Sequence, residues 1–216
     1  MIVNTDELRF LCWNVAGIRS KLGDPSWLAS LADYNVICFQ ETWDKRPEWV
    51  TVDGFASFSI PALGSMAGRA RGGLLSLVAL SLPCVIEPMV SHSPNLCLTY
   101  LIFGQAKMLI DNVYNSQYEK TSPSVLEDLC CILRLFFSNH KANVLIIQGD
   151  FNIHPGLVCP LLVYDYYEFL GPLVHFEHSL QGDLLYHLMG DFSLINVAEE
   201  FNEIGEGALL PIYIYI

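Results

Sequence analysis

The sequence predicts an α/β domain built around a mixed β-sheet. Short apolar runs of strand length recur along the chain, and helical patterns separate the first two runs and the last two. The runs between them follow one another too closely for helical crossovers, which favours hairpins. With 216 residues, 52% of them hydrophobic, the chain is long enough for one buried core and therefore for one domain.

A β-α-β unit is predicted at the start of the chain. Residues 8–14 and 36–41 are apolar runs typical of buried strands. Between them Asp24 suits a helix N-cap, Pro25 suits the first helical turn, and Leu28 lies on the apolar side of the short helix that follows.

The remaining elements follow in order. Further strands are predicted at about 53–59, 73–79, 84–90, 96–103 and 107–114. The clearest helix begins at Ser122-Pro123 and ends near residue 139. Its apolar residues repeat at helical spacing: Leu126, Leu129, Cys130, Leu133, Phe136 and Phe137. This helix leads to a strand at 144–149, and another helix is predicted at 183–189 before the apolar segment 192–197.

Polar side chains follow three of these strands. Asn14 ends the first strand, Glu41 ends the second, and Asp150 and Asn152 follow the strand at 144–149. Sites in α/β sheets are built at the carboxyl ends of strands, and carboxylate and amide groups suit a hard cation and a phosphate. The structural alternative stays open for each residue, because Asp and Asn also stabilise turns and a glutamate can simply be solvated at a strand end.

Five short motifs then carry a family resemblance over about residues 8–197. They are Trp13-Asn14-Val15-Ala16-Gly17, Gln40-Glu41-Thr42, Arg71-Gly72-Gly73, Val113-Tyr114-Asn115 and Gly149-Asp150-Phe151-Asn152. In this order they resemble the endonuclease/exonuclease/phosphatase superfamily, and they are most similar to the endonuclease domains of LINE-type (non-LTR) retrotransposons. The resemblance implies a deoxyribonuclease I-like sandwich of two mixed sheets with helices outside.

The resemblance also implies magnesium-dependent hydrolysis of a phosphodiester in DNA, with Mn²⁺ as the alternative ion. Glu41 would hold the ion through a carboxylate oxygen, with Asn14 and Asp150 beside it. Asp150 would orient or deprotonate the attacking water, and Asn152 would bond a phosphate oxygen. Tyr114 would add a phenol donor near the same phosphate, although a tyrosine at this place is also typical of an amphipathic strand.

The sequence departs from the family pattern after these motifs. Family members normally carry a Ser-Asp-His turn whose histidine stabilises the phosphate, and the 216 residues contain no Ser-Asp-His. His175 and His178 have helical spacing, but no third ligand or metal signature surrounds them. We therefore expect a weak or inactive endonuclease, the alternative being a catalytically dead fragment or a binding protein that keeps the fold.

The end of the sequence suggests an origin for this departure. We expect residues 1–210 to form one domain that lacks the usual C-terminal strands, and residues 211–216 to form a repeat-like tail. Its alternating Ile and Tyr would arise from an AT dinucleotide repeat in the gene. Such a tail can fill an open strand edge, although it adds no catalytic group.

The net charge of −12 argues against a general attraction to DNA. The charge is unevenly distributed, however: residues 1–71 carry seven basic and eight acidic side chains, whereas residues 142–216 carry ten acids and no lysine or arginine. Six basic residues lie in predicted loops close to the motifs and are the candidate phosphate contacts: Arg19, Lys21, Lys45, Arg46, Arg69 and Arg71.

Neither a membrane span nor a signal peptide is predicted. The most apolar stretch, 72–86, is shorter than a membrane span and contains Pro83. The seven cysteines are odd in number and form no Cys-x-x-Cys pair. We therefore expect a reduced intracellular compartment, without distinguishing nucleus from cytoplasm.

Overall fold

The computed structural model describes residues 8–46, 50–64, 70–89, 93–115, 125–139, 144–152, 195–196 and 212–215. The strands are β1 (Phe10–Asn14), β2 (Val36–Gln40), β3 (Phe55–Ile60), β4 (Leu74–Ala79), β5 (Val85–Pro88), β6 (Leu96–Phe103), β7 (Ala106–Tyr114), β8 (Val144–Asp150), β9 (Ile195–Asn196) and β10 (Ile212–Tyr215). The helices are α1 (Arg19–Leu22), α2 (Pro25–Leu31) and α3 (Val125–Asn139).

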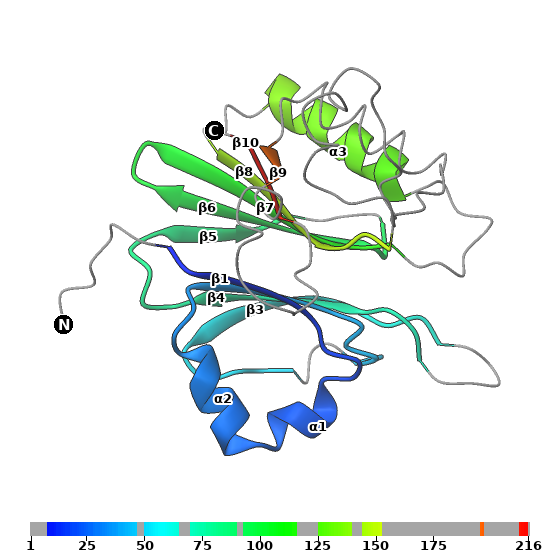
Figure 1. The fold of residues 1–216 in the computed structure, drawn as a ribbon. Coiled ribbons are helices and arrows are strands. Elements are labelled where there is room, and N and C mark those ends of the chain that lie inside the picture. The colour runs from blue at the N-terminus through cyan, green and yellow to red at the C-terminus, as the bar shows by residue number, and fades with distance from the viewer. Residues whose placement is uncertain are drawn as a thin grey trace, which may run out of the picture.

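These elements form a two-sheet α/β sandwich, as the sequence analysis predicted. The first sheet has the strand order β1-β2-β4-β3, and the second has the order β5-β6-β7-β8-β10-β9. Both sheets are mixed, because β1 pairs parallel to β2 and β7 pairs parallel to β8, whereas their other strand pairs are antiparallel. Figure 1 shows α1 and α2 outside the first sheet and α3 outside the second.

Two parallel pairs follow from the two helical crossovers of the chain. Helices α1 and α2 connect β1 to β2, and α3 lies between β7 and β8 in sequence. Asp24 caps α2 as predicted, because its carboxylate accepts hydrogen bonds from the backbone N–H groups of Ser26 and Trp27. Each crossover brings the carboxyl ends of its two strands to the same edge of a sheet.

The core has three apolar layers. The layer between the sheets contains Val36 and Val78 from the first sheet and Ile110 and Ile146 from the second. A second layer lies between the first sheet and helices α1 and α2, and a third lies between the second sheet and α3. The strands β2, β4, β7 and β8 are therefore covered on both faces, which explains their long apolar runs.

One acidic residue interrupts the layer beneath α3. Asp111 lies on the same face of β7 as Leu109 and Val113, which belong to that layer. Its side chain is fully buried, and neither carboxyl oxygen has a hydrogen-bond partner among the described residues. Burial raises the pKa of Asp111 from 3.8 to about 8.

The structure also corrects two expectations. The strands predicted at 73–79 and 84–90 do not form a hairpin, because β4 belongs to the first sheet and β5 to the second. Arg19 and Lys21 lie in helix α1, which was predicted as a loop. The helix start at Ser122-Pro123 and the helix predicted at 183–189 lie outside the described residues.

Residues 212–215 of the expected tail form a strand in the second sheet. Strand β10 pairs antiparallel with β8, and the short strand β9 pairs with β10 on its other side. None of the described helices is long and apolar enough to span a membrane.

Candidate active site

Four of the predicted site residues end, or directly follow, four strands at one edge of the sandwich. Asn14 ends β1 and Glu41 follows β2 in the first sheet, while Tyr114 ends β7 and Asp150 ends β8 in the second. In the two parallel pairs, Asn14 is in register with Gln40, and Tyr114 is in register with Asp150. The four side chains therefore lie on facing strands of the two sheets.

Two hydrogen bonds join these residues across the sheets. Asn14 Nδ2 donates to Asp150 Oδ2 at 2.8 Å, and the Tyr114 hydroxyl donates to Glu41 Oε1 at 2.9 Å. The other end of the Asn14 amide accepts a hydrogen bond from the backbone N–H of Ala16 at 3.2 Å. Asn14 thus orients Asp150, and Tyr114 orients Glu41. The Tyr114 hydroxyl is directed to Glu41 in the structure, and its expected contact with a phosphate stays a prediction.

Asn152, the fifth predicted residue, is fixed beside Asp150 by the turn that ends β8. Its backbone N–H donates to Asp150 Oδ1 at 3.1 Å, and its side-chain Nδ2 donates to the carbonyl oxygen of Asn115 at 2.8 Å. The backbone N–H of Asn115 in turn donates to the carbonyl oxygen of Asp150 at 2.9 Å. Both oxygens of the Asp150 carboxylate consequently accept a hydrogen bond from within the chain, which fixes the orientation of the carboxylate.

The turn that carries Glu41 is bonded to the loop after β1. The backbone N–H of Gly17 donates to the Glu41 carbonyl oxygen at 2.8 Å, and that of Ile18 donates to the Thr42 carbonyl oxygen at 3.0 Å. The Trp43 ring lies against Gly17, where an added Cβ would come within 2.7 Å of the ring. The loop has no room for a side chain at that position.

Strained backbone is concentrated in these same loops. The described residues other than glycine with positive φ are Ala16 (47°), Glu41 (53°), Trp43 (54°) and Asn152 (45°). All four lie in the loops after β1, β2 and β8. Left-handed backbone costs free energy for such residues and persists where the surrounding structure holds it, most often at functional sites.

A buried amide pair supports the strands beneath the site. Gln40 and Asn112 are both inaccessible to solvent, and Gln40 Nε2 donates to Asn112 Oδ1 at 2.6 Å across the two sheets. Asn112 Nδ2 donates to the carbonyl oxygens of Phe39 and Leu75, both at 3.2 Å. Because buried amides are costly unless they are hydrogen-bonded, this network favours one alignment of β2, β4 and β7.

The described basic candidates lie at the same edge of the first sheet. Arg19 and Lys21 follow β1, Lys45 and Arg46 follow β2, and Arg71 precedes β4, which runs antiparallel to β2. The sixth candidate, Arg69, lies outside the described residues. Lys21 Nζ donates to the Val15 carbonyl oxygen at 2.8 Å and lies 5.5 Å from the centroid of the Trp13 ring.

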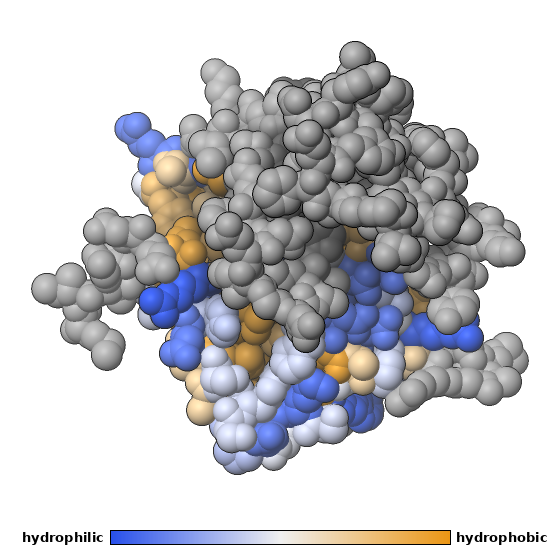
Figure 2. Space-filling view, viewed as in Figure 1, coloured by the Kyte–Doolittle hydropathy of each residue, from blue (hydrophilic) through white to orange (hydrophobic). Residues whose placement is uncertain are grey.

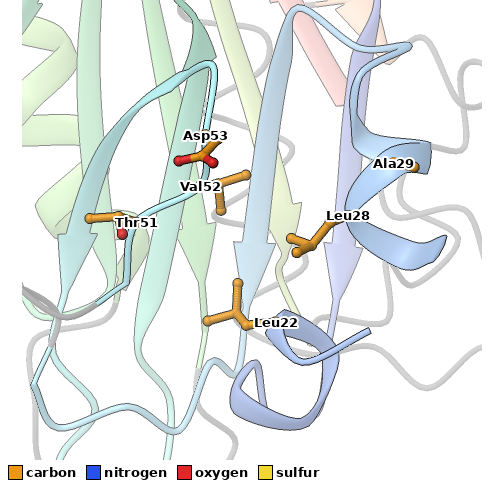
Figure 3. Close-up of a pocket in the computed structure, with 6 residues that line it drawn as sticks. All are labelled: Leu22, Leu28, Ala29, Thr51, Val52 and Asp53. Atoms are coloured by element: carbon orange, nitrogen blue, oxygen red, sulfur yellow. The ribbon is translucent and has the colours of Figure 1, made fainter. Parts of the chain in front are cut away.

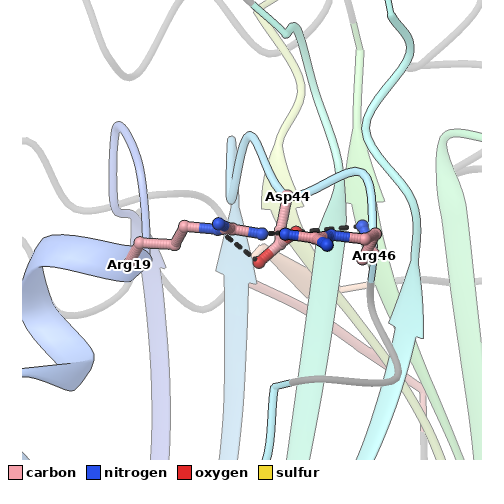
Figure 4. Close-up of polar contacts among 3 residues, drawn as sticks. All are labelled: Arg19, Asp44 and Arg46. Carbon is pink, nitrogen blue, oxygen red and sulfur yellow. Dashed lines mark hydrogen bonds and ion pairs between the residues drawn. The ribbon is translucent and has the colours of Figure 1, made fainter.

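Part of this positive charge is neutralised within the chain. Arg19 donates two hydrogen bonds to the buried carboxylate of Asp44, at 3.0 and 3.1 Å, and the Arg46 backbone N–H donates a third at 2.9 Å (Figure 4). The Arg19 guanidinium lowers the pKa of Asp44 below its usual value. Arg19 therefore attracts a phosphate less strongly than an unpaired arginine would.

A separate pocket of about 370 Å³ lies on the outer side of the first sheet. It is lined by Leu22, Leu28, Ala29, Thr51, Val52 and Asp53 (Figure 3). None of the five predicted site residues lines it. Figure 2 shows mostly hydrophilic residues over α1 and α2, with smaller hydrophobic areas between them.

The donor set suits a hard divalent cation. Among the described residues no group of three His, Cys, Asp or Glu side chains could hold a metal, but Mg²⁺ commonly uses only one or two carboxylates and keeps several waters. Glu41 and Asp150 supply carboxylate oxygens of this kind. All six histidines of the sequence, including His175 and His178, lie outside the described residues.

Sequence reasoning missed the residues that hold the site in place. The Gln40–Asn112 pair joins the strands beneath the site. The Asn115 carbonyl oxygen accepts from Asn152, and the carbonyl oxygens of the two glycines before β4 accept from the turn after Glu41. The motifs containing Gln40, Asn115 and the glycines gave the only indication in the sequence. No residue type indicated the left-handed backbone at Glu41.

Comparison with known proteins gives structural matches only, since no protein-family model and no curated protein sequence matches the chain. The catalytic domain of Xenopus laevis APE2 is 15% identical with a TM-score of 0.64, and the match covers 96% of this chain and 82% of that one. The endonuclease domain of TRAS1, a telomere-specific non-LTR retrotransposon, is 14% identical with a TM-score of 0.54, covering 95% and 83%. The Neisseria 3′ phosphatase NExo bound to a product DNA hairpin is 16% identical with a TM-score of 0.61, covering 96% and 86%.

Proposed function

Because the chain has the fold of the endonuclease/exonuclease/phosphatase superfamily, we propose that it is a divalent-metal-dependent phosphodiesterase of the endonuclease type. The observation that carries the proposal is the pair of hydrogen bonds that joins Asn14 to Asp150 and Tyr114 to Glu41 across the two sheets. Four polar side chains from distant parts of the sequence meet at the carboxyl ends of their strands. Stability of the fold alone does not require polar residues at these positions.

Each residue has a proposed role, and the hydrogen bonds of Glu41 and Asp150 support theirs. Glu41, oriented by Tyr114, would hold Mg²⁺, or Mn²⁺ in its place, with Asp150 as the nearby second carboxylate. The bound ion would supply charge neutralisation at the phosphate. Asp150, held by Asn14, would orient or deprotonate the attacking water, and Asn152 would contact a phosphate oxygen. Asn14 uses both ends of its amide within the chain, so we assign it first to positioning Asp150 and second to the metal.

DNA is the proposed substrate. The NExo structure is bound to a product DNA hairpin, and five of the basic candidates of this chain lie in segments at the site edge. The acidic residues elsewhere and the Arg19–Asp44 pair reduce the attraction to phosphate. Binding should therefore be weak and should fall further as salt is raised.

We propose in addition that the protein derives from a retrotransposon endonuclease and turns over slowly. Two observations support this origin: the structural similarity to the TRAS1 endonuclease domain, and the residues of the five motifs. The sequence contains no Ser-Asp-His, and loss of one group that stabilises the transition state typically lowers the rate by about 100-fold or more. The same observation favours the second candidate, a catalytically dead fragment or a binding protein that keeps the fold.

A nicking assay on supercoiled plasmid distinguishes the two candidates. We expect slow nicking that requires Mg²⁺ or Mn²⁺, and a rate at least about 100-fold lower in Glu41→Ala and Asp150→Ala. Glu87→Ala and Asp53→Ala are matched controls, because they remove exposed acids outside the site. Nicking that is absent in the wild type under all metal conditions favours the dead protein, and nicking that survives in both site variants contradicts our assignment of the residues.

The cysteines bear on the compartment that we propose for the protein. The cysteines among the described residues are free thiols: Cys12, Cys38, Cys84, Cys97, Cys130 and Cys131. Burial raises the pKa of Cys12 to about 12, and the Asp150 charge acts in the same direction. Cysteines that form no disulfide among the described residues suit the reduced intracellular compartment that we propose.

A further inference from the structure

The Arg71-Gly72-Gly73 motif contains two glycines to which the proposed mechanism gives no role. Gly72 and Gly73 lie directly before β4 with φ of 65° and 85°. The carbonyl oxygen of Gly73 accepts the backbone N–H of Thr42 at 3.1 Å, and that of Gly72 accepts the backbone N–H of Trp43 at 3.0 Å. The two glycines thus bond to the turn that carries Glu41, on the side away from the β1 loop.

This turn needs support from both sides. Glu41 and Trp43 have left-handed backbone, which costs free energy and is retained only when neighbouring bonds hold it. Gly17 and Ile18 bond the carbonyl oxygens of Glu41 and Thr42 from one side, and the two glycines bond the N–H groups that follow Glu41 from the other. These four hydrogen bonds hold the backbone turn from which the Glu41 carboxylate projects.

The two glycine positions differ in the room that they leave for a side chain. A Cβ at Gly73 would overlap Thr42 Oγ1 and lie 3.1 Å from both the Cβ and the backbone nitrogen of Ala62. A Cβ at Gly72 would lie 3.4 Å from Cε1 of the Tyr114 ring, which is an ordinary van der Waals contact and places the ring beside this position. Both glycines therefore contact the Glu41 turn, and Gly72 also lies beside the tyrosine that bonds the Glu41 carboxylate.

We propose that Gly72 and Gly73 are positioning residues that fix Glu41 and Tyr114 in the geometry needed to bind a divalent cation. This inference rests on the proposed function, since it assigns the glycines to the metal site of that function. They act through their backbone carbonyl groups and their lack of side chains, and they touch neither ion nor substrate.

The chain offers a matched control for Gly73→Ala. Gly54 has φ of 84°, against 85° for Gly73, but an added Cβ at Gly54 meets nothing within 4 Å. Gly54 lies next to β3 at the opposite end of the first sheet, because Phe55 pairs with Ala79, the last residue of β4. Gly73→Ala and Gly54→Ala therefore place alanine at nearly the same positive φ, and only Gly73→Ala adds a Cβ against the Glu41 turn.

The first readout needs no metal. Fluorotyrosine is incorporated into the protein, and the Tyr114 signal in the fluorine NMR spectrum is assigned from its loss in Tyr114→Phe. We expect this signal to move in Gly73→Ala toward its position in Glu41→Ala, and to keep its wild-type position in Gly54→Ala. A wild-type position in Gly73→Ala, or equal movement in both alanine variants, would overturn the proposal.

The second readout is Mn²⁺ binding, followed by electron paramagnetic resonance. Residues that orient metal ligands typically change affinity by tenfold or more, so we expect at least about tenfold weaker binding in Gly73→Ala and less than about twofold change in Gly54→Ala. If Glu41→Ala binds Mn²⁺ as the wild type does, the proposed function fails. The NMR comparison then still decides whether the glycines position Glu41 and Tyr114.

A double variant tests the cause of the effect. Thr42→Ala removes the hydroxyl that a Cβ at Gly73 would overlap, so adding it to Gly73→Ala should restore part of the Mn²⁺ affinity and of the Tyr114 signal position. Crowding at Ala62 remains, so both values should lie between those of the wild type and Glu41→Ala. If Gly73→Ala alone does not stay folded, the double variant is measured in its place. A wild-type Mn²⁺ affinity together with a wild-type Tyr114 signal position in the double variant would then contradict the proposal.

Discussion

Gly149→Ala should abolish folding of the domain at ordinary temperatures. Gly149 lies in β8, in register with Val113 of β7, and an added Cβ would overlap the backbone oxygen of Val113 and approach its carbonyl carbon and nitrogen. The two strands cannot keep their pairing around that atom. We expect a loss of at least ~5 kcal/mol of unfolding free energy, which equals the whole net stability of a marginally stable domain.

The measurement is urea unfolding followed by circular dichroism, with Gly104→Ala as control. Gly104 also has positive φ, at 62°, but an added Cβ there meets nothing within 4 Å. Its substitution should cost only ~1 kcal/mol, the ordinary penalty of placing alanine in left-handed backbone. Equal costs for the two substitutions would show that β7 and β8 are not paired in the described register.

Asp111→Val should stabilise the protein, and the gain should depend on pH. The pKa of Asp111 is about 8 in the folded protein, against an ordinary value of 3.8, because the side chain is buried in an apolar layer. Between these values the folded state keeps a proton that the unfolded chain releases, so the unfolding free energy falls as pH rises from about 4 to 8. At about 1.4 kcal/mol per pKa unit, the cost near pH 7 is about 4 kcal/mol.

Valine suits this position because the residues paired with Asp111 are Leu98 and Ile147. We expect Asp111→Val to raise the unfolding free energy at pH 7 by about 2–4 kcal/mol, and by much less at pH 4. Asp111→Asn is the control: it removes the titrating group but keeps a buried polar side chain, so it should flatten the pH profile with a smaller gain. A wild-type pH profile in both variants would mean that Asp111 titrates normally.

Much of the fold follows from local sequence features. Strand β6 occupies the predicted residues 96–103, and α2 begins after the predicted N-cap Asp24. Both parallel pairs follow from a helix between two apolar runs. Local features could not assign strands to sheets, because β4 pairs with β2 and β3 while β5 pairs with β6, and the short segment between β4 and β5 looks like a hairpin turn.

The side chains of the candidate site could be predicted from the sequence. The hydrogen bonds and the backbone conformations that hold them in place could not. Asn14, Glu41 and Asp150 stood out because oxygen-bearing residues directly followed apolar strands. The bonds among them depend on which strands face each other across the sandwich, which no local pattern specifies. The left-handed backbone of Glu41 has no sequence signature either, because its cause lies in Gly17, Ile18 and the two glycines before β4. The catalytic roles of these residues stay predictions.

The most direct test of the central claim is the position of a bound ion. In a crystal soaked with Mn²⁺ and measured at a wavelength where manganese scatters anomalously, we predict one strong peak at direct coordination distance from a Glu41 carboxylate oxygen, on the side facing Asp150. A peak elsewhere, or Glu41 and Asp150 directed into separate regions of solvent with no ion between the sheets, would contradict the account.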